Sequence, residues 1–573
     1  MKKITLFLLF ISINIYSQYN YFGTDMIPNA ESSQPRDLTS FNNKIYFSAT
    51  FKKTDANGGV YYDQEMGYFN PTDNSYGQFA NINAIELTSA GSAPRNFFEF
   101  NGHLYFIASS GNNLENRELY RTNGVTVELF KDLIPGTGSG FPQGSSPQFT
   151  IMNNKLYFFA RNDAQTGDAV LWQTDGTAQN TVVVSTIAYQ NFYGLYKNCV
   201  IAFNNELFFC GSLNLGSEVY KFNEVTNTTT LIKDLFPGTN SGVPSEFAIF
   251  NDELFFVSFT PSYTGKRKIC KTDGTTAGTT DVLDAILFSH TPTGLTVLNN
   301  KLVFVAVNPA TTKVNLFKCE FNSTLSNYAI SLVKEFVEGQ NLPALILDNK
   351  TFTLFNNELY FVASQNTDPN NGGIRQIYKT NGSTAGTVKA IAIDANQVGS
   401  NQIVVTINNL FTFNNKLCFG MRDLGTADQL WISNGSNSYI EKLTNVGNGL
   451  PQEPFLPDHE TVINKLYVAA GSSSPFRGEE LWQIEDASPL SNEITNTYST
   501  FLLYPNPTQG VINVQLQNSV EFTVEIYDLI GKKVGQFSNQ NQLDISNYNA
   551  GMYLIKITDL QSNKTTTQKV IKQ

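Results

Sequence analysis

Residues 149–160 read Phe-Thr-Ile-Met-Asn-Asn-Lys-Leu-Tyr-Phe-Phe-Ala, and residues 352–363 read Phe-Thr-Leu-Phe-Asn-Asn-Glu-Leu-Tyr-Phe-Val-Ala. This pattern, an apolar run on each side of an asparagine-led turn, recurs along the whole 573-residue chain. A two-residue turn of type I′ needs positive φ at both central positions, which Asn, Gly and Asp tolerate best. Each unit is therefore predicted to contain a β-hairpin. The turns begin at Asn42, Asn101, Asn153, Asn204, Asn251, Asn299, Asn356, Asn414 and, as a degenerate last copy, Ile463.

Two further strand-like segments follow most of these hairpins. The third segment carries all three tryptophans of the chain at one position, as Trp172, Trp431 and Trp482. Periodic aromatic residues are typical of wedges between neighbouring sheets, and a sugar-stacking surface is the alternative. The fourth segment ends in Pro-Gly at 135–136 and 237–238, which stops the strand and turns the chain.

Four strands per unit and a repeat of about fifty residues predict an all-β fold dominated by a large β-propeller. The number of hairpins leaves three arrangements open: one unusually large ring, a ring with one unit outside it, or two rings. We favour one ring of eight or nine blades. The last unit lacks a fourth segment, so residues 20–28 are predicted to hydrogen-bond beside the strand at 479–485 and to close the final blade.

One segment of the repeats resembles a known family. Residues 271–279 read Lys-Thr-Asp-Gly-Thr-Thr-Ala-Gly-Thr, and 171–177 and 379–387 are close to them. They resemble the Glu-Leu-Trp-Lys-Thr-Asp-Gly-Thr-x-x-Gly-Thr repeat of large secreted bacterial proteins, over most of residues 20–487. The resemblance implies an extracellular propeller-like array over 18–487 and brings no catalytic residues with it.

The N-terminus has the form of a secretory signal peptide. Residues 1–17 contain Lys2-Lys3 and an apolar core, with a predicted cut between Ser17 and Gln18. No other stretch approaches the ~20 apolar residues of a membrane-spanning helix. A net charge of -11 without a basic run argues against a nucleic-acid partner. The mature chain is therefore expected to be secreted or displayed on the outer-membrane surface, after passing through the periplasm.

The cysteines allow one pairing to be tested. Five cysteines are an odd number for an exported chain, so at least one of them lacks an internal disulfide partner. Cys199 and Cys210 lie at equal distances from the Asn204 turn and are expected to face each other across the hairpin. They form either a disulfide or a pair of buried thiols.

The C-terminal segment has a different composition. Residues 488–499 form a Ser- and Asn-rich linker, and the alternation of apolar and polar residues within 500–573 predicts a small Ig-like β-sandwich. Residues 500–573 resemble the type A C-terminal sorting domain of the Bacteroidota type IX secretion system. The resemblance implies export through that machinery and removal of the domain by a sortase-like peptidase. The matching residues are Tyr504, Pro505, Asn506, Pro507, Gly510, Gly531, Lys532, Gly551, Tyr553 and Lys572.

Motifs of catalysis are missing from the sequence. The three histidines, His103, His290 and His459, have no metal-ligand spacing. No cofactor is expected, with one exception: Asp55, Asn57 and Asp63 place oxygen atoms in one loop, partly echoed at 368–373, and make a candidate calcium site. A loop held by Asx turns is the alternative.

Two functions follow from these observations. The first is a non-enzymatic secreted or cell-surface propeller that binds a glycan or a protein through the loops of one rim. The second is an extracellular polysaccharide hydrolase or lyase with acidic residues at the propeller channel. Two or three carboxylates about 5 to 10 Å apart at the channel mouth would favour the enzyme.

Overall fold

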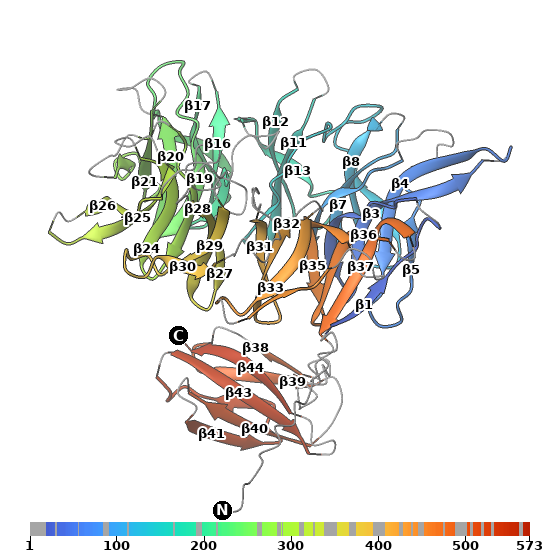
Figure 1. Cartoon of the computed structure of the whole chain (residues 1–573). Helices are drawn as coiled ribbons and strands as arrows, with labels where there is room; N and C mark the ends of the chain where they lie inside the picture. Colours follow the sequence, from blue (N-terminus) through green and yellow to red (C-terminus); the bar gives the residue numbers. More distant parts are fainter. Residues whose placement is uncertain are drawn as a thin grey trace, which may run out of the picture. The chain divides into compact units, whose positions relative to one another are not determined.

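The computed structural model divides the chain into two units, Met1–Ala487 and Ser488–Gln573. Their elements are β-strands, which confirms the predicted all-β class (Figure 1). Among the described residues, no helix is long and apolar enough to span a bilayer. The structure describes residues 19–28, 31–55, 57–83, 91–111, 114–163, 167–190, 198–213, 216–259, 266–282, 288, 290–308, 314–324, 327–336, 352–365, 374–392, 407–422, 428–436, 439–444, 452–473, 476–486, 501–504, 508–516, 521–528, 532–549, 551–560 and 565–572.

The described residues of the first unit form nine antiparallel sheets. Eight sheets have four strands and the fourth sheet has five. Sheet 1 consists of β2 (Arg36–Phe41), β3 (Lys44–Thr54), β4 (Val60–Phe69) and β5 (Tyr76–Ala80); sheet 2 of β6 (Arg95–Phe100), β7 (His103–Ser109), β8 (Arg117–Thr122) and β9 (Val127–Lys131); and sheet 3 of β10 (Thr150–Met152), β11 (Lys155–Arg161), β12 (Ala169–Thr174) and β13 (Val182–Ser185). Sheet 4 consists of β14 (Ala188–Tyr189), β15 (Val200–Phe203), β16 (Glu206–Ser212), β17 (Ser217–Asn223) and β18 (Thr228–Lys233); sheet 5 of β19 (Ser245–Phe250), β20 (Glu253–Phe259), β21 (Arg267–Thr272) and β22 (Thr280–Asp281); and sheet 6 of β23 (Thr293–Leu298), β24 (Lys301–Val307), β25 (Val314–Asn322) and β26 (Asn327–Lys334). Sheet 7 consists of β27 (Thr353–Phe355), β28 (Glu358–Gln365), β29 (Ile374–Thr380) and β30 (Val388–Ile391); sheet 8 of β31 (Ile407–Phe413), β32 (Lys416–Arg422), β33 (Asp428–Ser433) and β34 (Ile440–Lys442); and sheet 9 of β35 (Gln452–Val462), β36 (Lys465–Ser473), β37 (Phe476–Asp486) and β1 (Tyr19–Gly23).

The asparagine-led turns have the predicted backbone conformation. In sheet 3, Asn153 and Asn154 have φ of 50° and 58°, and they join β10 to β11 with Met152 opposite Lys155. Both central residues have positive φ in all nine turns, including Ile463 and Asn464. The hairpin prediction is therefore confirmed in every unit.

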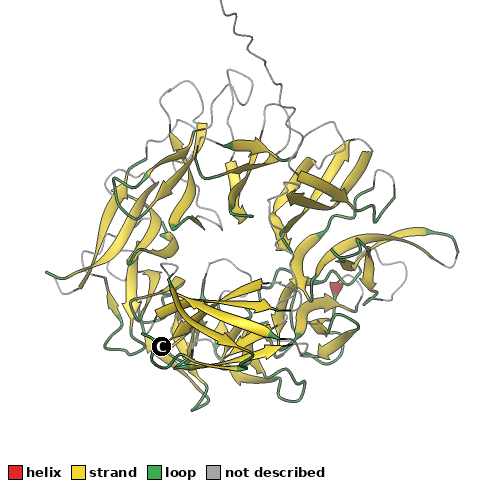
Figure 2. Cartoon of the chain, turned by 90° about the horizontal axis from the view of Figure 1, so that it is seen from below, coloured by secondary structure: helices red, strands yellow, loops and turns green. Residues whose placement is uncertain are grey.

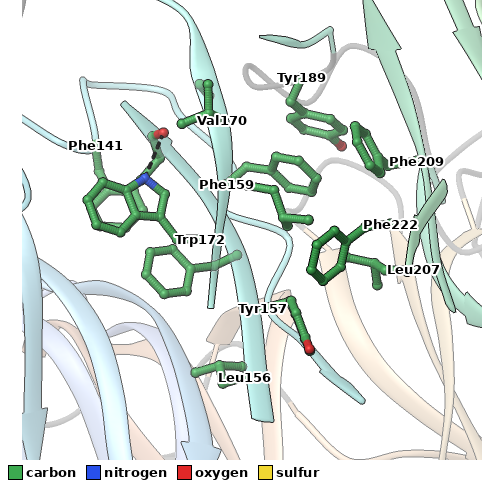
Figure 3. Close-up of a cluster of buried hydrophobic side chains, with 14 of the residues drawn as sticks. Phe141, Leu156, Tyr157, Phe159, Val170, Trp172, Tyr189, Leu207, Phe209 and Phe222 are labelled. Carbon is green, nitrogen blue, oxygen red and sulfur yellow. Dashed lines mark hydrogen bonds between the residues drawn. The ribbon is translucent and has the colours of Figure 1, made fainter. Parts of the chain in front are cut away.

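The aromatic position of the third strand belongs to the core between sheets (Figure 3). The Trp172 indole stacks on Phe158 with 8° between the ring planes, and its Nε1 donates a hydrogen bond to the carbonyl oxygen of Ala160 at 3.2 Å. Tyr120, Tyr220, Phe317 and Tyr378 stack in the same way on an aromatic residue of the second strand. These side chains are buried, so the aromatic residue is a wedge and the sugar-stacking alternative is wrong.

The sheets follow one another in a closed cycle. Each pair of consecutive sheets shares a cluster of buried apolar side chains, and the cluster with Leu38, Phe47 and Tyr467 joins sheet 9 to sheet 1. Figure 2 shows the sheets arranged around a central opening. Several first strands also contact each other from sheet to sheet, as β2 does with β6 and with β35. The first strands therefore form the inner wall of the first unit.

The N-terminal strand completes sheet 9, as predicted. Strand β1 pairs antiparallel with β37, with Gly23 opposite Trp482. Just beyond the strand, the Thr24 amide donates to the carbonyl of Leu481 at 2.9 Å, and the Thr24 hydroxyl donates to the Glu480 carboxylate at 3.1 Å. The first and last segments of the unit are thus held in one sheet, which covers the edge of β37.

Polar contacts join neighbouring sheets at their outer strands. Lys131, Lys233 and Lys334 each end a fourth strand. The ammonium group of each donates to a backbone carbonyl in the 3–4 turn of the next sheet, at 3.1, 2.6 and 3.0 Å. These contacts reinforce the apolar clusters at the periphery.

The second unit contains two antiparallel sheets among its described residues (Figure 1). They share one core, in which Ile512 and Leu543 of the first sheet meet Val524 and Ile555 of the second. The first sheet consists of β38 (Phe501–Tyr504), β39 (Val511–Leu516) and β42 (Gln542–Asp544), and the second of β41 (Lys533–Ser538), β40 (Phe522–Tyr527), β43 (Gly551–Asp559) and β44 (Thr565–Lys572).

Candidate functional site

The most exposed apolar side chains of the inner wall lie at one position of the first strand, two residues before the turn. Ile151, Ile249, Val297 and Leu354 are 48%, 43%, 45% and 60% exposed. The next residue of each strand, for example Phe250 after Ile249, is buried in the core. The full set, which we call the inner-wall ring, is Ser40, Glu99, Ile151, Ala202, Ile249, Val297, Leu354, Thr412 and Thr461.

The inner-wall ring has an apolar half and a polar half. Ile151, Ala202, Ile249, Val297 and Leu354 come from sheets 3 to 7 in unbroken order. The four members from sheets 8, 9, 1 and 2 are hydroxyl residues or, at Glu99, a carboxylate. Exposed apolar groups in such a row are unusual for a water-facing surface and make it a candidate site.

A second repeated feature of the inner wall is a strained backbone position five residues before the turn. Asp37, Asn96, Gln148, Glu246 and Asn409 all have φ between 50° and 58° there. At most of these positions the pairing with the second strand shifts register. Such β-bulges re-aim side chains and are common next to functional sites.

Sheets 9, 1 and 2 bring a polar cluster together at these bulges. Asp458 accepts a hydrogen bond from the amide of Leu38 at 2.8 Å, which places its carboxylate beside Asp37. Surrounding protein raises the pKa of Asp37 to about 6, the negative charge of Asp458 adds to the increase, and Arg95 opposes it. Asp37 is nevertheless exposed to solvent.

Two neighbouring polar atoms in this cluster have unmet hydrogen-bonding capacity. Arg95 Nε and Asn96 Oδ1 are buried without a hydrogen-bond partner among the described residues. Buried polar atoms ordinarily find a partner, since an unsatisfied one costs about 1–3 kcal/mol. The donor of Arg95 and the acceptor of Asn96, next to the carboxyl group of Asp37, suit a ligand that both accepts and donates hydrogen bonds. We call Asp37, Arg95, Asn96 and Asp458 the polar cluster.

The candidate calcium ligands are used in other ways. Asp55 Oδ1 accepts hydrogen bonds from the amides of Asn57 and Gly59 at 2.8 and 2.7 Å, which is the Asx-turn alternative. Asp63 lies opposite Phe51 in the β3–β4 hairpin and forms an ion pair with Lys53. Within the described part of the chain, no group of three or more acidic, His or Cys side chains could hold a metal. The partly similar segment 368–373 lies outside the described residues.

The histidines are dispersed over the first unit. His103 starts β7, and its Nδ1 lies 3.1 Å from the carbonyl of Asn101 in the same hairpin. The ring of His459 stacks on Phe411 of the neighbouring sheet, with centroids 3.8 Å apart, and His290 lies in an exposed segment before β23.

The five cysteines are all described, and each is a buried thiol. The amide of Cys210 donates to the carbonyl of Cys199 at 3.2 Å, so the two residues face each other as predicted, without a disulfide. Burial raises the pKa of Cys199 to about 12 and that of Cys210 well above its ordinary value.

The Thr-Asp-Gly-Thr motifs build turns. The Thr272 hydroxyl accepts a hydrogen bond from the Gly274 amide at 3.0 Å and lies 2.7 Å from the Thr279 hydroxyl. The Asp273 carboxylate accepts from the amide and hydroxyl of Thr275. Residues 174–181 and 380–387 repeat this arrangement. The motif is satisfied internally and shapes the loop.

The described residues of the sorting motif are positions of turn and core. Tyr553 is buried and donates to the carbonyl of Asn549 at 2.9 Å, and Lys572 is 9% exposed. Gly510 lies so close to Ser546 that a Cβ would approach its Cα to 2.9 Å. Lys532 closes a turn on Asp528. Tyr504 ends β38 and Gly551 starts β43, whereas Pro505, Asn506, Pro507, Gly531, Ser17 and Gln18 lie outside the described residues.

Comparison with known families identifies the second unit. The model of the secretion system C-terminal sorting domain matches residues 502–573. The chain therefore carries a type IX sorting domain and is a secreted or cell-surface protein that interacts with the secretion machinery. No curated protein matches the chain.

Solved structures provide remote similarities. PorZ, an essential bacterial surface component of the type-IX secretion system of Porphyromonas gingivalis, shares 14% identity at a TM-score of 0.35, over 94% of this chain and 75% of that chain. The extracellular domain of the putative hybrid two component system BT4673 from B. thetaiotaomicron shares 10% identity at a TM-score of 0.30, over 97% and 90%. An oligogalacturonate lyase in complex with manganese shares 13% identity at a TM-score of 0.31, over 58% of this chain and 86% of that chain. At these TM-scores, none of the similarities carries an argument about function.

The inner-wall ring and the polar cluster were missed at the level of sequence. Counting back two and five residues from each turn would have found both positions. Sequence alone, however, does not tell which face of a first strand is left uncovered, because that depends on the neighbouring sheets.

Proposed function

We propose that this chain is a type IX cargo whose first unit is a nine-bladed β-propeller that binds an extracellular glycan or protein without catalysing a reaction. The observation that carries the export is the sorting domain at 502–573. The Ig-like assignment of that domain, a signal peptide over 1–17 and removal of the domain by a sortase-like peptidase belong to the same proposal.

The propeller assignment is supported by connectivity. Four-stranded antiparallel sheets follow one another in chain order, and buried clusters link each to the next and the last to the first. Propeller blades are built in this way around a central channel. Nine blades exceed the usual four to eight or so, and the shared strand pairing of β1 with β37 fits the closure of such a ring.

The inner wall supports the binding function. Its apolar half offers four side chains that are 43–60% exposed, and the polar cluster offers the unsatisfied atoms of Arg95 and Asn96. Burial of one such apolar side chain by a ligand would contribute on the order of 1 kcal/mol, since only about half of each surface remains to be covered. A ligand that contacts both halves would gain specificity from the hydrogen bonds.

A binding screen with matched variants tests this function. The purified mature chain is screened against glycans and extracellular-matrix proteins, and any binder is compared with Val297→Lys and Leu129→Lys. Val297 is 45% exposed on the inner wall, and Leu129 is 49% exposed on the outer strand β9. Loss of binding in the first variant alone is expected; equal binding by both variants would contradict the assignment of the site.

The export is tested separately by removal of the second unit. A chain that lacks residues 500–573 is expected to accumulate in the periplasm of a host with a type IX system. Surface display or release of that shortened chain would contradict the proposal.

The polar cluster favours one second candidate, an acid-base hydrolase or lyase of polysaccharides. A carboxyl group with a pKa of about 6 beside a second carboxylate is suited to proton transfer near neutral pH. Hydrolysis of an acidic or neutral polysaccharide by the wild-type chain, lost in Asp37→Asn and retained in Asp55→Asn, would replace the binding function with this one.

A further inference from the structure

We propose that the outer face of strands β40, β43 and β44 is the surface by which the sorting domain docks on a component of the secretion machinery. The inference rests on the proposed export and deepens it by assigning the contact to particular residues. Tyr553 and Lys572 of the sorting motif are buried, whereas Lys532 and Gly551 are exposed at a turn and at a strand end, so the motif leaves room for a further recognition surface on a sheet face.

Strand pairing brings four residues together on this face. Along β43, Tyr553, Ile555 and Ile557 are buried in the core, so the alternate residues face outward. Met552 lies opposite Ile571 of β44, and Leu554 lies opposite Tyr527 of β40. Residues two apart on one strand share a face, so Tyr527, Met552, Leu554 and Ile571 form one contiguous patch. We call these four residues the docking patch.

The docking patch is exposed where a small domain would be expected to be polar. Leu554 and Ile571 are 39% and 37% exposed, and Met552 and Tyr527 are half-buried. Val511 and Leu560, the other large apolar side chains exposed among the described residues of this unit, are not paired with one another in any strand. Contiguous exposed apolar side chains with a polar rim indicate a protein-protein contact.

The rim gives the charge expected of the partner. Glu525 occupies the row next to Tyr527 and Leu554, opposite Lys556. Its carboxylate forms ion pairs with Lys533 at 2.7 Å and with Lys556 at 3.5 Å, and it accepts the Tyr527 hydroxyl at 3.1 Å. Two lysines against one glutamate leave this rim with an excess positive charge. The partner surface is therefore apolar at its centre and acidic at its edge.

The secretion machinery is the occupant that fits this patch. The family match covers both sheets of the unit, and a sorting domain acts by contact with the system that exports it. The inner faces of the two sheets are filled by their shared core, so a contact made by a sheet face uses an outer face. Of the outer faces described, this one carries the contiguous apolar residues and the basic rim.

The test uses the full chain in a host with a type IX system and measures the fractions at the surface, in the medium and in the periplasm. Leu554→Lys with Ile571→Lys is expected to lower the exported fraction about tenfold or more, which corresponds to a loss of about 1.4 kcal/mol in docking free energy. Val511→Lys, at a 41% exposed position of the other sheet, is expected to be exported as wild type.

Folding is controlled with a second variant and a direct measurement. Leu554→Thr with Ile571→Thr keeps strand propensity while removing apolar surface, and it should also be retained. The purified full-length variants should unfold at the temperature of the wild type. A lowered unfolding temperature in the threonine variant would show that the patch is covered by the chain itself, and would overturn the proposal.

Two further results would overturn the docking patch. The first is normal export of the lysine variant, and the second is equal retention of Val511→Lys. If deletion of 500–573 blocks export while the patch variants are exported, only this inference fails. If the deletion variant is exported, the proposed function fails with it.

Discussion

Ile463 shows how much a single backbone position matters in this repeat. It occupies the first turn position of the ninth hairpin, where the other eight turns have Asn, and its φ is 51°. A β-branched residue in the left-handed region clashes with its own backbone, which costs roughly 1–2 kcal/mol. The side chain is 41% exposed, so little packing offsets this strain.

Ile463→Asn is therefore expected to raise the free energy of unfolding by about 1 kcal/mol, because Asn tolerates positive φ. The measurement is the urea concentration at the midpoint of unfolding. The mirror change, Asn414→Ile, should lower the midpoint by a comparable amount. An unchanged midpoint in both variants would show that Ile463 carries no backbone strain.

The buried thiols give a second prediction at the residue scale. Because burial raises the pKa of Cys199 and Cys210, neither forms the reactive thiolate at pH 8. The native protein should not react with Ellman's reagent, whereas the unfolded protein should titrate all five thiols. Rapid labelling of the native chain, or a mass that rises on reduction, would argue against this state.

At the scale of the element, the third strands carry a buried polar residue that holds the connection to the next sheet. The Glu118 carboxylate accepts hydrogen bonds from the amides of Leu133 and Gly140 at 2.7 and 2.8 Å. Glu218 does the same with Leu235 and Gly242. At the equivalent position of sheet 6, Asn315 accepts a hydrogen bond from the amide of Phe336. In these sheets, a local interaction thus holds the segment that leads to the next sheet. The residues at this position are Glu65, Glu118, Glu218, Asn315, Gln376, Gln429 and Glu480.

These glutamates predict how stability depends on pH. Burial raises the pKa of Glu118 from 4.5 to about 8 and that of Glu218 to about 7. A folded-state pKa above the unfolded value means that the stabilisation is fully present below pH ~4.5 and is lost as the pH rises through the folded-state pKa. The unfolding temperature should therefore fall between pH 5.5 and 8.5.

The variant Glu118→Gln should make this fall smaller, since an amide does not titrate and the chain itself uses Gln376 and Gln429 at this position. Each pKa unit removed corresponds to about 1.4 kcal/mol at most. Thermal unfolding at the two pH values provides the measurement. Glu128→Gln, at an exposed residue of β9, is the control and should leave the pH dependence as it is in the wild type.

At the scale of the whole molecule, closure of the first unit depends on a contact between its two ends. The buried hydroxyl of Thr24 donates to Glu480 and accepts from the amide of Leu481, both at 3.1 Å. Residues 24 and 480 lie 456 positions apart in the sequence. Closure is therefore the most non-local step of folding, and such steps are slow because the loop entropy is lost first.

Thr24→Val is expected to lower the free energy of unfolding by about 1–3 kcal/mol, because it leaves buried partners unsatisfied. It should also raise the hydrogen-exchange rates of β36 and β37, whose pairing with β1 weakens. Thr412→Val, at an exposed position of the inner wall, should have neither effect. Uniform exchange changes over all sheets would indicate that closure is not a separate step.

Some properties were predictable because they depend on neighbours along the chain. Asn153-Asn154 specified a turn with positive φ, and the equal spacing of Cys199 and Cys210 from their turn specified that they face each other. The motif at 504–553 specified the sorting domain. The inner-wall ring, the polar cluster and the docking patch could not be derived in this way, because exposure of Ile151 or Leu554 depends on which strands cover them.

The sequence by itself determined the hairpins, the fourfold strand unit and the sorting domain, since turn chemistry and strand periodicity act over a few residues. Only the tertiary structure decided that the sheets form one closed cycle, that Asp37 and Asp458 meet, and that four apolar side chains of the first strands stay exposed. Those relations join residues hundreds of positions apart, and they are fixed by how whole sheets bury their faces against one another.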